Sequence, residues 1–151
     1  MARNNRNNYK HRREQEIPNE INNIISDINS CEMLSKMDIK DLVDEIAYKV
    51  AGYAVDTNLK SNQLRNFFGF VKKMERRESW DKIKSDFYLL KPRMAVKVGR
   101  NDVPEGFFKV IAISMDKVDV GSEEEKLVNF KRFIEFFESI VAYHKYLGGG
   151  D

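Results

Sequence analysis

The sequence is poor in the residues that build most catalytic and metal sites. It contains one cysteine, two histidines and three prolines among 151 residues. Cys31 has no second cysteine with which to form an internal disulfide, and a lone thiol is typical of a reducing compartment. No HExxH, CxxC or phosphate-binding glycine motif occurs. The sequence therefore predicts no metal site and no cofactor, and we expect a protein that is not an enzyme.

Long apolar segments are also absent. No run of about 18 apolar residues occurs, so no transmembrane helix and no membrane partner is expected. The first residues, MARNNRNNYKHRREQE, are polar and basic and lack the apolar segment of a secretory signal. Residues 1–16 bury too little apolar surface to offset the entropy of ordering, which predicts a disordered basic tail. These features favour a cytoplasmic protein.

The charges that are present are segregated along the chain. Residues 60–100 contain twelve Lys or Arg against four Asp or Glu, a net charge of +8. Residues 17–59 contain three against eight, a net charge of −5, and residues 101–151 contain six against ten, a net charge of −4. One basic region on a nearly neutral small domain is typical of a protein that binds a polyanion.

Apolar residues recur at helical spacing in most of the chain, and strand alternation is absent. The fold class predicted is all-α, a compact bundle of about five helices. We expect helices at 38–54, 61–77, 79–100 and 105–117, and the longest after a capping box at Ser122 and Glu125. Asp38, Ser61 and Ser79 are expected helix caps, and Pro92 is expected to kink or restart its helix. Residues 17–37 are expected to be a short helical extension at the edge of the core, and residues 38–151 the bundle domain.

Two basic stripes follow from the helical spacing. Arg65, Lys72 and Arg76 recur at i, i+7 and i+11, within about 20° of Arg65 around the axis. Arg93, Lys97 and Arg100 recur at i, i+4 and i+7. A charged helix face is often only solvated, which is the alternative interpretation of either stripe.

Three blocks occur in order between residues 59 and 149. They read LKSNQLRNF at 59–67, YLLKPRMAVKVGR at 88–100 and FIEFFESIVAYHKYLGG at 133–149. In this order the chain resembles the small α-helical subunit of type III-A CRISPR–Cas effectors, the Csm complex. The residues that match the family's motifs are Ser61, Gln63, Leu64, Arg65, Val98, Gly99, Arg100, Arg132, Glu138, Val141, Ala142, Tyr143, Lys145, Gly148 and Gly149. The resemblance covers about 38–151; Val98 replaces the usual alanine, and Pro92 is a departure.

The resemblance implies a subunit without nuclease activity. Several copies would stack as an inner filament along the paired guide RNA and target RNA. The partners would be a backbone subunit that grips the guide and a large polymerase-like subunit at the end of the filament.

A scaffold for any guide must bind RNA without reading its sequence. Lys and Arg achieve this through phosphates, and Ser or Asn at a helix start adds bonds to phosphate or sugar. The candidate RNA-binding residues are Lys60, Ser61, Asn62, Arg65, Lys72, Arg76, Arg93, Lys97 and Arg100, with Arg132 and Lys145 as further candidates.

Several of these residues have an alternative interpretation. Arg100 follows a glycine at a helix end, where its side chain would instead bond the last carbonyls. Gly69 lies on the Arg65 stripe and is either a point of close backbone approach or a weak point in a helix. Phe67, Phe68 and Trp80 would stack on bases only if they were not packed in the core. The two histidines are not obvious functional groups: His11 lies in the tail, and His144 is expected to be packed or hydrogen-bonded.

Two other functions remain open at this point. The first is a protein–protein adaptor that does not contact RNA and whose acidic helices dock basic neighbours. The second is a DNA-binding helical regulator, which would place a recognition helix after the turn at Asn58–Arg65.

Overall fold

The structure is a computed structural model that describes residues 17–151. The regular elements over this range are α2 (Asn19–Ser30), η1 (Leu34–Lys36), η2 (Asp41–Ile46), α3 (Ala47–Asp56), α4 (Ser61–Met74), α5 (Trp80–Gly99), α6 (Glu105–Asp116) and α7 (Glu123–Tyr146). η1 is a short 3₁₀ turn, and η2 is a stretch of π-helix that continues into α3. No strand occurs within residues 17–151, so the all-α prediction is confirmed. The predicted tail of residues 1–16, with His11, lies outside the described range.

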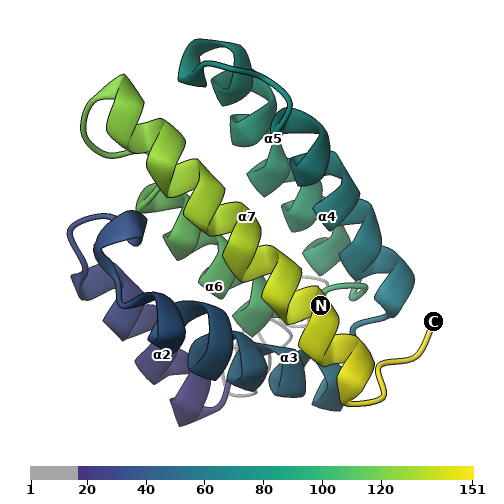
Figure 1. The fold of residues 1–151 in the computed structure, drawn as a ribbon. Coiled ribbons are helices and arrows are strands. Elements are labelled where there is room, and N and C mark those ends of the chain that lie inside the picture. Colours follow the sequence, from purple (N-terminus) through teal and green to yellow (C-terminus); the bar gives the residue numbers. More distant parts are fainter. Residues whose placement is uncertain (1–16) are drawn as a thin grey trace, which may run out of the picture.

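Helix α7, with 24 residues, runs through the middle of the bundle (Figure 1). It packs against α3 on one side and against α4 on the other. Helix α6 lies behind it and packs against α2 and α5. The acidic residues 17–59 and the basic residues 60–100 therefore lie on opposite sides of α7.

Phenylalanine side chains join the α4–α5 hairpin to α7. The ring of Phe87 on α5 meets Phe130 and Phe133 of α7 edge to face, at a centroid distance of 5.8 Å in both pairs. Phe68 on α4 stacks on Phe137, with ring centroids 5.8 Å apart. Phe67 and Trp80 are buried and Phe68 is partly buried, so these three candidate stacking residues belong to the core.

Three of the predicted helix starts are confirmed. The Asp38 carboxylate accepts a hydrogen bond from the backbone N–H of Asp41, and the Ser79 hydroxyl accepts one from that of Lys82. Ser122 and Glu125 form the capping box of α7. The prediction for Ser61 was wrong: Lys60 is the N-cap residue of α4, and Ser61 is the first helical residue. Helix α5 does not restart at Pro92 but runs continuously from Trp80 to Gly99.

The sequence suggested that residues 17–37 lie at the edge of the core. In the structure, helix α2 is instead part of the core. Ile21, Ile24 and Ile28 are at most 4% exposed, and α2 packs along α6. The following turn is fixed by Asn129 of α7, whose amide oxygen accepts from the backbone N–H of Ser35 at 3.0 Å. The polar composition of residues 17–37 hides this apolar stripe, because only one side of a helix is buried. The domain boundary at residue 38 stays a prediction.

Candidate nucleic-acid interface

The two basic stripes lie on the two helices of the α4–α5 hairpin. Arg65 and Lys72 are exposed on α4, and Arg76 is exposed just beyond its end. The guanidinium of Arg93 on α5 lies over the ring of Phe70 on α4, 4.3 Å from the ring centroid. This contact places Arg93 against α4, about 140° around that helix from Arg65. Lys97 and Arg100 extend the α5 stripe at helical spacing.

Two of the α4 cations carry exposed ion pairs. A terminal nitrogen of Arg65 lies 2.8 Å from a carboxylate oxygen of Asp151, and the Lys72 ammonium lies 2.6 Å from Glu75. The hydrogen bond to Glu75 raises the pKa of Lys72 above its ordinary value, so this side chain is charged at neutral pH. Exposed pairs of this kind contribute little to stability and exchange readily with other anions.

No side-chain hydrogen bond or ion pair joins Arg76, Lys97 or Arg100 to any of residues 17–151. The alternative role of Arg100 is not supported, because its side chain bonds no helix-end carbonyl in this part of the chain; only its backbone N–H reaches Val96. Lys73 is a further exposed cation on the same outer side of α4. It lies one residue after Lys72 and therefore off the spacing of the Arg65 stripe, although it contributes to the net charge of residues 60–100.

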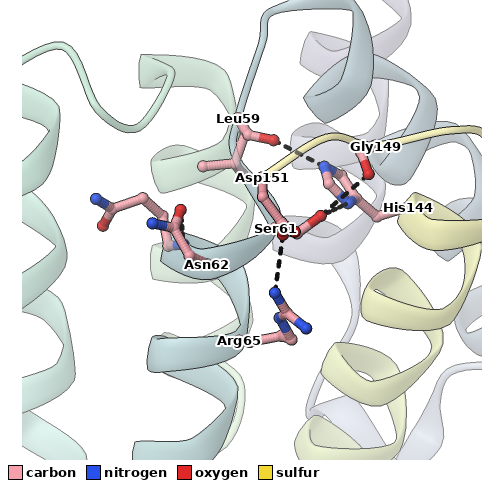
Figure 2. A network of polar contacts seen from close by, with 8 residues as sticks. Leu59, Ser61, Asn62, Arg65, His144, Gly149 and Asp151 are labelled. Carbon is pink, nitrogen blue, oxygen red and sulfur yellow. Dashed lines mark hydrogen bonds and ion pairs between the residues drawn. The ribbon is translucent and has the colours of Figure 1, made fainter.

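The candidates at the start of α4 are already engaged (Figure 2). Ser61 is only 9% exposed, and its hydroxyl donates to the carbonyl of Gly149 at 3.2 Å. The Asn62 amide oxygen accepts from the backbone N–H of Gln63, and Lys60 donates to the Asn58 side chain at 3.0 Å. Asn62 is exposed, and its amide nitrogen has no partner among the described residues.

His144 connects the end of α7 to the segment before α4 (Figure 2). It is 1% exposed, its Nε2 lies 2.7 Å from the carbonyl oxygen of Leu59, and its Nδ1 lies 3.5 Å from Ser61 Oγ. The predicted packed or hydrogen-bonded role of His144 is therefore confirmed. Its partners lie more than 80 positions away in the sequence, which local spacing does not reveal.

Lys145, one residue further along α7, approaches the α4 stripe. A small pocket of about 130 Å³ is lined by both Arg65 and Lys145, together with Ser61, His144 and the last three residues of the chain. The structure thus brings together two candidates that come from different sequence motifs.

Arg132 is separate from the other candidates. It lies half-buried on α7, where its Nη1 donates to the carbonyl of Met37 at 3.5 Å and its Nε lies 3.6 Å from Glu135. These contacts direct the side chain toward the segment between η1 and η2, across α7 from the hairpin.

Within residues 17–151 no three His, Cys, Asp or Glu side chains are grouped so as to hold a metal ion. In the same range, no helix combines the length and apolar character needed to cross a bilayer.

Comparison with known families decides what kind of chain this is. The family model described as Csm2 Type III-A matches residues 36–150. The chain belongs to the Csm2 type III-A family. It is accordingly a small subunit of the type III-A CRISPR effector, the Csm complex. No curated protein and no solved structure matches it significantly. The matched range contains all three sequence blocks, and the structure joins the first to the last through Ser61, His144 and Gly149.

Proposed function

We propose that this subunit is non-catalytic and binds the guide RNA–target RNA region of the effector through phosphate and sugar contacts, without sequence specificity. The observation that carries the proposal is the exposed basic outer side of the α4–α5 hairpin in a member of this family. We further propose that it acts in the cytoplasm, in antiviral defence, with several copies lying next to one another along the RNA.

The chemistry of the hairpin suits an A-form duplex. Such a duplex offers phosphates and 2′-hydroxyls to a protein but hides its base edges in a deep, narrow groove. Arg76, Lys97 and Arg100 have no competing partner in the described chain, and the pairs of Arg65 and Lys72 are exposed enough for a phosphate to displace the carboxylate. Binding by these groups would be independent of sequence and sensitive to salt.

The opposite side of α7 suits protein partners. Asp41 and Glu45 are exposed on η2, beside the exposed side chains of Ile39 and Tyr48, which are 47% and 45% exposed. Acidic residues around exposed apolar side chains support contact with a basic neighbour. That neighbour would be another subunit of the complex, including its backbone and large polymerase-like subunits, or an adjacent copy of this chain.

A matched pair of charge reversals tests the proposal. Arg65→Glu with Lys72→Glu changes the basic side, and Lys40→Glu with Lys49→Glu makes the same charge change on the acidic side, where both lysines are exposed. Binding to a fluorescent RNA duplex of about 20 base pairs is measured by anisotropy at several salt concentrations. We expect the first pair to lower the affinity at least tenfold and to flatten the salt dependence, because phosphate contacts are lost. The second pair should change the affinity by about twofold at most.

Three outcomes would contradict the proposal. Equal losses for the two pairs would show that only the net charge matters. Unchanged RNA binding with retained protein partners would favour the adaptor. A preference for duplex DNA over the RNA duplex would favour the DNA-binding regulator.

A further inference from the structure

The end of the chain is fastened to the start of α4 by a set of contacts that we call the clasp, formed by Leu59, Ser61, His144, Gly149 and Gly150. The backbone N–H of Ser61 donates to the carbonyl of Gly150 at 2.8 Å, and the Ser61 hydroxyl donates to that of Gly149. The Nε2 atom of His144 lies 2.7 Å from the carbonyl oxygen of Leu59. The backbone N–H of Gly149 returns to the carbonyl of His144 at 2.8 Å.

Two neighbouring glycines differ in their surroundings within the clasp. A Cβ atom at Gly149 would overlap the imidazole ring of His144, which is buried and held at Leu59. A Cβ atom at Gly150 would meet no heavy atom within 4 Å. The close approach of residue 149 to the ring therefore requires glycine at 149 but not at 150.

The clasp replaces an ordinary helix cap. Lys60, the N-cap residue, makes no side-chain bond to the first turn of α4, so the Gly150 carbonyl satisfies a backbone donor that would otherwise lack an acceptor. One turn along α4 is Arg65, and on the last turn of α7 is Lys145; both line the same pocket with Gly149 and Gly150.

We propose that the clasp positions Arg65 and Lys145 as a pair, so that the two cations meet neighbouring phosphates of the RNA. His144 and Gly149 are positioning residues in this proposal and do not contact RNA themselves. The inference rests on the proposed function, because it concerns how the same basic side is held.

The matched substitutions Gly149→Ala and Gly150→Ala, made in the full chain, test the clasp. The first substitution forces the backbone of residue 149 away from the His144 ring. The second adds the same methyl group where no heavy atom lies within 4 Å. We expect Gly149→Ala to lower the affinity for the RNA duplex by about threefold to tenfold. The slope of log affinity against log salt should fall by the value of about one phosphate contact. Gly150→Ala should match the unaltered chain. Amide exchange of Ser61 reports the clasp directly, and should be faster only in Gly149→Ala.

A double-mutant cycle separates positioning from general weakening. If the clasp acts through the two cations, Gly149→Ala should have little further effect in a chain that already carries Arg65→Gln and Lys145→Gln. Full additivity would overturn the proposal, as would equal affinities for the two alanine variants despite faster Ser61 exchange. Loss of the cooperative unfolding transition in Gly149→Ala would also overturn it, because the clasp would then serve the fold as a whole. Absence of RNA binding by the unaltered chain would instead reject the proposed function.

Discussion

The α4–α5 hairpin and the α2–α3 side pack apolar stripes into the same core, yet their outer surfaces carry opposite charge. Buried Phe87 and Leu90 on one side correspond to buried Ile28 and Val50 on the other. Residues 60–100 nevertheless carry a net charge of +8 and residues 17–59 a net charge of −5. Because core packing does not require either sign, the difference supports our proposal of two kinds of partner: a polyanion for the hairpin and basic protein surfaces for the opposite side.

The comparison depends on α2 belonging to the common core, and Ile28→Ala tests this. Ile28 is fully buried, so its truncation should lower the free energy of unfolding by about 2–5 kcal/mol in urea titrations. Ile39→Ala, at a side chain that is 47% exposed, is the control and should cost less than about 1 kcal/mol. Similar small losses for both would show that α2 is peripheral after all.

His144 links the basic side to α7, and two substitutions measure that link. His144→Leu leaves the buried carbonyl of Leu59 without its donor and should lower the free energy of unfolding by about 1–3 kcal/mol. His144→Gln keeps an N–H donor of similar reach and should lose less. Equal losses for both variants would mean that ring packing, and not the hydrogen bond, fastens the start of α4.

RNA affinity should respond differently to loss of charge at the arginines of the α4–α5 hairpin and at Arg132 of α7. Arg76→Gln and Arg100→Gln should each lower RNA affinity by about threefold to tenfold and reduce the salt slope by about 0.7–0.9, the value of one phosphate contact. Arg132→Gln should leave the slope unchanged, because Arg132 is half-buried against Met37 and Glu135. The distinction between the sides would be lost if Arg132→Gln flattened the slope as much as the others.

The smallest effect is expected at Gly69 on the basic side. A Cβ atom there meets nothing within 4 Å, so Gly69→Ala should raise the free energy of unfolding by about 0.5–1 kcal/mol through helix propensity. RNA affinity should stay within about twofold. A stabilised chain with clearly weaker RNA binding would instead place the RNA backbone directly against α4 at this position.

Local features of the fold could be predicted because their causes lie within a few residues. The capping box at Ser122 and Glu125, the cap at Ser79 and the glycine at the end of α5 involve contacts between near neighbours in sequence. These elements were predicted correctly because helix formation depends on local bonds and on one periodic stripe.

Features that depend on distant contacts could not be predicted in the same way. Ser61 resembles a cap, but its hydroxyl turns to Gly149, 88 positions away. The burial of α2 depends on α6, and the position of Arg132 depends on the carbonyl of Met37, 95 positions earlier. For the site, the basic stripes followed from spacing, whereas the pocket shared by Arg65 and Lys145 required the fold.

The most direct measurement is ultraviolet cross-linking of the tagged subunit within the effector complex purified from its own host, followed by mass spectrometry of peptides joined to RNA. RNA-linked peptides should come from residues 60–100 and not from residues 17–59. Recovery of the other subunits with no RNA linked to this chain, or RNA links confined to residues 17–59, would contradict the assignment of the α4–α5 hairpin to RNA.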